Sequence, residues 1–154
     1  TMMTRLMRAA CVLQFLVLVL SFQSAQAEEL TGIFMVEISG LKDSSGDVYI
    51  AVYDSDSTWL SDEMVLNQKV DIADALDGDL VRTELLLPLG DYALSVFYDQ
   101  DGDGELKTNF IGMPKEPIAL SNNAVAKFGP PKYSDAVFSL GAQPIIQSLS
   151  IKAL

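Results

Sequence analysis

Closely spaced acidic side chains in one segment of this chain have the oxygen-rich pattern of a cation site. Asp99, Asp101 and Asp103 stand at the first, third and fifth positions of a run in which Gly104 is the sixth residue. This spacing matches the first two-thirds of an EF-hand loop, whose glycine permits the sharp turn that points the carboxylates at one ion. The backbone carbonyl of Glu105 would add a further ligand, so the segment predicts a calcium site.

The end of the segment departs from the EF-hand pattern. Phe110 stands at the twelfth position, where an EF-hand has a bidentate glutamate. Asn109 or a more distant oxygen would have to complete the shell, so we expect a weak site. The alternative is a solvated acidic turn without a metal. The predicted calcium ligands are Asp99, Asp101, Asp103, Glu105 and Asn109.

The residue types present exclude several classes of enzyme. Histidine is absent, and Cys11, the only cysteine, lies in the N-terminal segment. Ser-His-Asp triads, Cys-His pairs and the usual zinc sites are therefore excluded. Paired carboxylates between Asp99 and Glu116 leave a glycan hydrolase as an alternative. We prefer a non-catalytic binding or structural module, because a small sandwich rarely offers a cleft between two such carboxylates.

The charge of the chain favours basic partners. It carries 10 basic and 21 acidic residues, a formal net charge of −11. Such a surface repels the phosphates of nucleic acids and anionic lipids. We therefore expect cations, or an envelope or extracellular partner with basic groups, and no nucleic acid.

The N-terminus has the three parts of a secretory signal peptide. Arg5 and Arg8 precede an apolar run over residues 9–22, and Ala25-Gln26-Ala27 ends in small residues. The run is shorter than the roughly 20 residues of a membrane-spanning helix. We predict a signal peptide over residues 1–27 and a periplasmic or secreted domain over 28–154 with no membrane span. An uncleaved anchor is the alternative.

Alternating apolar residues predict strands in the exported part. The pattern covers residues 34–38 and 48–52, which we expect to pair as a hairpin around Gly40 to Gly46. A second hairpin is predicted from 81–87 and 92–98, where Pro88 and Gly90 suit a turn. Tyr92, Leu94, Val96 and Tyr98 would share one face.

The rest of the chain adds two further strands and a long loop. Residues 136–140 and 145–151 have the length and composition of strands, while 58–69 is compatible with a helical turn or a strand. A single all-β domain follows, an immunoglobulin-like or transthyretin-like sandwich of about seven strands. Its long acidic connection covers residues 99–134 and is expected to carry the binding role.

Five blocks of sequence resemble a known bacterial family. They are residues 87–93, 98–106, 109–116, 121–124 and 129–131, in this order. Together they resemble bacterial domain of unknown function 2141. The resemblance implies an exported β-sandwich similar to carboxypeptidase regulatory domains, without an established activity. The family commonly has His where this chain has Tyr98, which argues against a role that needs an imidazole there.

Two polar or aromatic features outside the acidic run have structural interpretations. Ser121, Asn122 and Asn123 are expected to cap their own backbone rather than bind a ligand, because Ser and Asn side chains often serve turns. Trp59, the only tryptophan, is expected to fill the core rather than to form a sugar platform.

Overall fold

The computed structural model describes residues 27–153, so the predicted signal peptide lies almost wholly outside the described residues. None of the helices in the described range is long and apolar enough to cross a membrane. The elements, in chain order, are β1 (Thr31–Ser39), β2 (Asp47–Tyr53), β3 (Leu66–Asp71), α1 (Ile72–Ala75), β4 (Leu76–Asp77), β5 (Leu80–Pro88), β6 (Gly90–Asp99), β7 (Ile118–Leu120), the 3₁₀ turn η1 (Ser121–Asn123), α2 (Tyr133–Ala136), β8 (Phe138–Leu140) and β9 (Ile145–Ser150).

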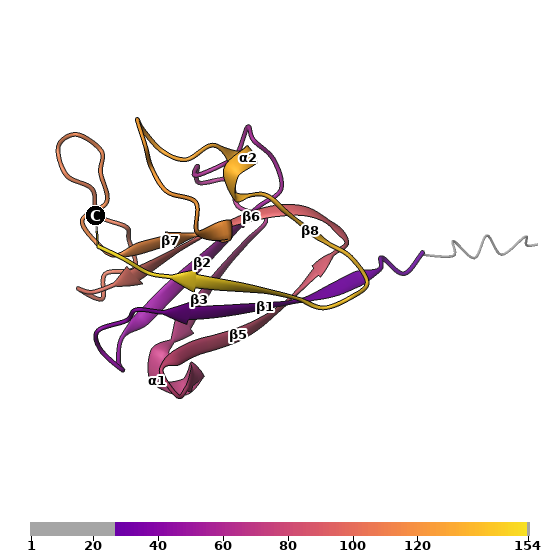
Figure 1. Cartoon of the computed structure of the whole chain (residues 1–154), viewed down its shortest axis with the longest axis horizontal. Helices are drawn as coiled ribbons and strands as arrows, with labels where there is room; N and C mark the ends of the chain where they lie inside the picture. The colour runs from indigo at the N-terminus through magenta and orange to yellow at the C-terminus, as the bar shows by residue number, and fades with distance from the viewer. Residues whose placement is uncertain (1–26, 154) are drawn as a thin grey trace, which may run out of the picture.

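The strands form two packed sheets (Figure 1). One has the order β4-β5-β1-β9, and the other has the order β3-β2-β6-β7 with β8 also paired to β6. The buried side chains of both sheets form one hydrophobic cluster between them. The predicted all-β sandwich is confirmed.

The period-two pattern of each strand decides which side chains enter this core. Phe34, Val36 and Ile38 of β1 are fully buried, while their neighbours along the strand are partly exposed. On β6 the predicted face of Tyr92, Leu94, Val96 and Tyr98 is buried, as expected for residues that alternate across a pleated strand. Burying a large aliphatic or aromatic side chain stabilises the fold by about 1.5–3 kcal/mol.

Both predicted hairpins are wrong, although their strands exist. β1 pairs with β5 and, in parallel, with β9, whereas β2 pairs with β3 and β6. The turns at 40–46 and 88–90 therefore cross from one sheet to the other. Alternation shows which face of a strand is buried, but it carries no information about which strand lies beside it. The segment 58–69, which the sequence left open, contains a turn followed by the start of β3.

The predicted single loop over residues 99–134 is also divided. β7 and η1 separate a first connection, residues 100–117, from a second one, residues 124–132. β7 and β8 pair with the same edge of β6, opposite Ser95 to Phe97 and Gly90 to Tyr92 respectively. The edge strand is thus interrupted, and the chain leaves β6 after Leu120 and returns at Phe138.

Ser121 fills the gap in this interrupted edge. Leu94 lies between the two paired stretches of β6, and its N–H donates to the fully buried Ser121 hydroxyl oxygen at 2.9 Å. The same hydroxyl donates to the Ala136 carbonyl at 2.5 Å. A serine side chain therefore takes the place of a backbone partner and holds the returning chain against β6.

The two asparagines after Ser121 connect this region to the other sheet. The Asn123 side chain accepts from Ser150 N–H and donates to the Ser148 carbonyl, both at 2.9 Å, in the manner of a neighbouring strand. Asn122 exchanges hydrogen bonds with the Gln147 side chain. The structural role predicted for these residues holds, but their partners are β9 and β6 rather than their own backbone.

We predict that Ser121→Ala lowers the free energy of unfolding by about 2 kcal/mol, because the buried Leu94 N–H loses its acceptor. Urea denaturation measures this change. The matched variant Ser44→Ala, at an exposed turn position, should change it by less than about 0.5 kcal/mol. Equal effects of the two substitutions would contradict the role given to Ser121.

Candidate functional site

The acidic segment begins where β6 ends, and its first carboxylate is buried. Asp99 is 3% exposed. Its Oδ1 accepts from the N–H of Gly102 at 2.8 Å, and its Oδ2 accepts from the N–H of Gly104 at 2.9 Å. Gly104 has φ +80°, a conformation that side chains other than glycine rarely adopt. Asp99 and the glycine together therefore fold the chain into a tight turn.

The turn brings three predicted ligands together. Carboxylate oxygens of Asp99, Asp101 and Asp103 all lie within 4.8 Å of one another. Asp101 and Asp103 are exposed. The Lys107 ammonium lies 2.9 Å from Oδ2 of Asp103 and also bonds Oδ2 of Asp101. A lysine of the same loop therefore supplies positive charge to this carboxylate group.

The other two predicted ligands lie in the same loop and make other contacts. Glu105, whose backbone carbonyl is the predicted ligand, donates its backbone N–H to Oδ1 of Asp103 at 2.9 Å. The Asn109 side-chain oxygen accepts from the N–H groups of Ile111 and Met113, at 3.0 Å each. Asn109 thus shapes a turn farther along the loop.

A second buried carboxylate holds the other end of the connection. Glu116 is 5% exposed, and its two oxygens accept from the N–H of Gln100 at 2.8 Å and of Lys107 at 3.3 Å. Sequence reasoning considered Glu116 only as an acid of a hydrolase and missed this role. The available signal was an acidic residue enclosed by Pro114 and Pro117, in a stretch otherwise free of carboxylates.

Between these two anchors the chain forms a projecting arm, residues 107–115. Lys115 N–H donates to the Lys107 carbonyl at 2.8 Å, and Asn109 N–H donates to the Met113 carbonyl at 2.8 Å. Phe110 at the tip is 98% exposed and Ile111 is 64% exposed. The connection that contains the arm lies at the end of the sandwich where the chain finishes (Figure 1).

The charged groups at the base of the arm shift one another's pKa values. Hydrogen bonds to Asp101 and then Asp103 raise the pKa of Lys107 above its ordinary value. The Lys107 hydrogen bond, followed by the Glu105 N–H, lowers the pKa of Asp103. Tyr98 donates its hydroxyl to the Ser45 carbonyl at 3.2 Å. Burial, and then Asp43, raises its pKa.

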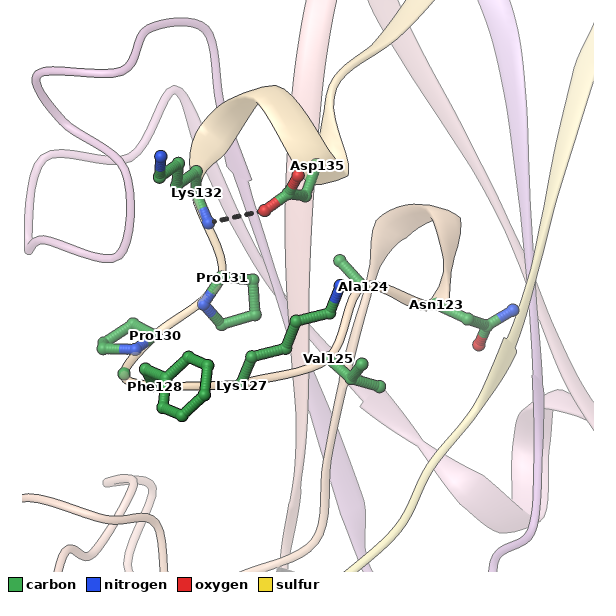
Figure 2. Close-up of a pocket in the computed structure, with 10 residues that line it drawn as sticks. Asn123, Ala124, Val125, Lys127, Phe128, Pro130, Pro131, Lys132 and Asp135 are labelled. Atoms are coloured by element: carbon green, nitrogen blue, oxygen red, sulfur yellow. Dashed lines mark hydrogen bonds between the residues drawn. The ribbon is translucent and has the colours of Figure 1, made fainter.

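The second connection, residues 124–132, lines an open pocket of about 430 Å³ (Figure 2). Figure 2 shows Phe128, Pro130 and Pro131 on one side of it, with Lys127 extending across the loop toward Ala124.

The Trp59 indole N–H donates to the Pro131 carbonyl at 2.8 Å and fixes this loop. Trp59 is partly exposed and lies outside the core cluster, so its prediction as core filler is wrong.

A groove of about 520 Å³ lies at the opposite end of β6 and is lined by Glu29, Asp54 and Asp91 among others. None of the residues that line these two cavities belongs to the acidic stretch from Asp99 to Glu116. The carboxylates of Asp99, Asp103 and Glu116 instead accept hydrogen bonds from backbone N–H groups. Asp101 and Asp103 also form ion pairs with Lys107.

Residues 36–147 match the family described as an uncharacterized protein conserved in bacteria (DUF2141). The match covers most of the chain, which therefore belongs to this family. No curated protein and no solved structure matches the chain.

The lowered pKa of Asp103 yields a pH prediction. A carboxyl group whose pKa is lower in the folded protein than its ordinary value of 3.8 stabilises the fold at pH values above 3.8. This stabilisation is lost as the pH falls through the lowered pKa of the folded protein. In an NMR titration of side-chain carboxyl carbons, Asp103 should titrate below 3.8. Lys107→Met should raise the midpoint, and Lys42→Met, at an exposed position, should leave it unchanged. A midpoint that ignores Lys107 would contradict the ion pair.

Proposed function

We propose that this DUF2141 protein is an exported, non-catalytic binding module that uses the arm, residues 107–115, to contact an envelope or extracellular partner. Calcium is proposed as a weak stabilising ion at the acidic base of the arm. The physiological partner is expected to carry an apolar surface that covers the tip.

The observation that carries this proposal is the exposed tip of an ordered arm. Two buried carboxylates and a ladder of backbone hydrogen bonds hold the arm in place, while Phe110 is 98% exposed. An aromatic side chain held in water adds nothing to the core, but aromatic residues are common centres of binding energy when a partner buries them.

Calcium fits the donor types at the base of the arm. The ion takes six to eight oxygen ligands, and the carboxylates of Asp99, Asp101 and Asp103 would supply three, with the Glu105 carbonyl and water as further donors. Lys107 competes for Asp101 and Asp103. A metal must displace this ammonium, which supports a low affinity.

Export is supported by the basic, apolar and small-residue parts of residues 1–27. N-terminal sequencing tests it: an exported protein that begins at Glu28 supports the proposal, and one that begins upstream contradicts cleavage at this site.

The glycan hydrolase remains the less favoured alternative. Such an enzyme needs two carboxyl groups about 5 to 9 Å apart beside a cleft that admits a sugar. The acids from Asp99 to Glu116 line neither of the two cavities described above. No specific observation favours this activity over binding.

We predict that Phe110→Ser removes partner binding and changes the free energy of unfolding by less than about 0.5 kcal/mol, because the ring contacts so little of the fold. A photoreactive residue at position 111 reports the contact as a cross-linked adduct in envelope preparations. Val125→Ser, an exposed apolar control on the other connection, should retain the adduct. An adduct unaffected by Phe110→Ser would contradict the proposal.

We predict that about 5 mM calcium stabilises the protein by about 1 kcal/mol if the dissociation constant is near 1 mM, and raises Tm by roughly 3–5 °C. Asp101→Asn should remove this rise, and Asp79→Asn, at an exposed turn, should retain it. Lys107→Met should strengthen calcium binding, because the competing ammonium is lost. Equal shifts with magnesium, or no shift with either ion, would remove calcium from the account.

A further inference from the structure

The groove at the far end of β6 differs in chemistry from the acidic loop. It lies where the segment before β1, the end of β2, the residues before β3 and the β5–β6 turn meet, and its volume is about 520 Å³. β6 has ten residues, so about 30 Å separates this groove from the base of the arm. The lining residues are Glu29, Asp54, Val65, Leu87, Pro88, Leu89, Gly90, Asp91 and Tyr92.

Three of the residues that line the groove are acidic, and none is basic. Glu29, Asp54 and Asp91 belong to three different segments, and the lining contains no Lys or Arg. Within residues 27–153, none of the three takes part in a salt bridge. Asp91 is oriented by Ser139, which lies opposite it on β8 and donates its hydroxyl to Oδ1 at 2.5 Å.

The floor and rim of the groove are apolar. Leu87 and Tyr92 are buried beneath it, while Val65 and Leu89 are 47% and 37% exposed at its rim. The Tyr92 hydroxyl donates to the Pro88 carbonyl at 2.7 Å, and Leu89 N–H donates to the Leu30 carbonyl at 3.0 Å. These bonds fix both walls, so the groove is part of the folded structure.

Partly or fully exposed apolar side chains also lie on the outer face of the β4-β5-β1-β9 sheet, to which Leu87 and Pro88 of the groove belong. Ile33 lies opposite Leu86, and Met35 lies opposite Ile146. Leu86 is 64% exposed and Ile146 is 61% exposed. The solvent face of such a sheet is normally polar, and contiguous exposed apolar side chains mark interaction surfaces.

The negative charge of the rim reaches into the groove. Burial, then Asp54 and Glu29, raises the pKa of Tyr92. Burial, then Asp91 and Asp54, raises the pKa of Tyr133, whose hydroxyl donates to the Asp91 carbonyl. Carboxylates without a salt-bridge partner attract a cation, and the apolar floor suits the apolar stem that carries it. A lysine or arginine side chain combines these two features.

We propose that this groove binds a basic, amphipathic segment of a partner polypeptide. A lysine or arginine head is held by Glu29, Asp54 and Asp91, and its methylene stem lies on Leu87 and Tyr92. Apolar neighbours of that residue cover Leu30, Leu86 and Ile33. The apolar side chains of Leu30, Leu86 and Ile33 extend beyond what a small amine can cover, which favours a polypeptide. This binding is independent of calcium and of the arm.

The test uses the full ¹⁵N-labelled chain and the peptide acetyl-Leu-Lys-Leu-Lys-Leu-amide as the probe. The peptide should shift the amide resonances of Asp54, Val65, Gly90 and Asp91, and those of Gly102 and Gly104 should stay in place. A peptide with Glu in place of Lys should cause no shift. Butylammonium chloride at equal concentration should bind much more weakly, because it lacks the apolar neighbours.

Variants at exposed positions complete the test. Glu29→Gln and Asp54→Asn should each weaken peptide binding by about three- to fivefold, as expected for loss of one exposed ion pair. Asp79→Asn, which removes the same charge far along β5 from the groove, should change it by less than twofold. The proposal would be overturned if Asp79→Asn weakened peptide binding as much as Glu29→Gln or Asp54→Asn does. Resonance shifts confined to the 99–105 turn, or butylammonium binding as tight as that of the peptide, would also overturn it.

Discussion

Backbone N–H groups that no neighbouring strand reaches must find another acceptor, and this constraint shapes the whole β6 side of the sandwich. Apart from tyrosines, the buried polar or charged residues within 27–153 are Asp99, Glu116 and Ser121. Each accepts hydrogen bonds from backbone N–H groups of β6 or of the loop that follows it. Removing such an acceptor leaves a buried donor unpaired, at a cost of about 1–3 kcal/mol. The two long connections are therefore fixed by side chains buried at their bases.

These contacts support our proposal that the acidic turn is ordered without a metal. Asp99 serves the fold through Gly102 and Gly104, and Lys107 supplies positive charge to Asp101 and Asp103. An EF-hand, in contrast, leaves its carboxylates for the ion. Calcium in this account adjusts the stability of an arm that is already formed. We propose that the exposed tip, rather than the ion, is the functional part of the loop.

The sequence allowed most of the longer strands and their buried faces to be predicted, because alternation is a local property, whereas the short β4 and β7 were missed and β3 was left open. The face from Tyr92 to Tyr98 is one example. The strand partners could not be predicted, since the connections at 40–46 and 88–90 suit a hairpin and an inter-sheet crossing equally well. The carboxylates of the three aspartates predicted as calcium ligands converge as the EF-hand spacing indicates. The EF-hand pattern describes only oxygen ligands, so it did not predict that Lys107 forms ion pairs with Asp101 and Asp103. The roles of Glu116 and Ser121 depend on tertiary neighbours that a single sequence does not reveal.

Hydrogen exchange of the loop amides, measured by NMR with a chelator present, tests the central claim most directly. If Asp99 and Glu116 order the turn without a metal, the amide protons of Gln100, Gly102 and Gly104 exchange at least about tenfold more slowly than in an unstructured peptide. Exchange at unstructured rates, with protection gained only on addition of calcium, would contradict the claim and make the ion, not the buried carboxylates, the organiser of the loop.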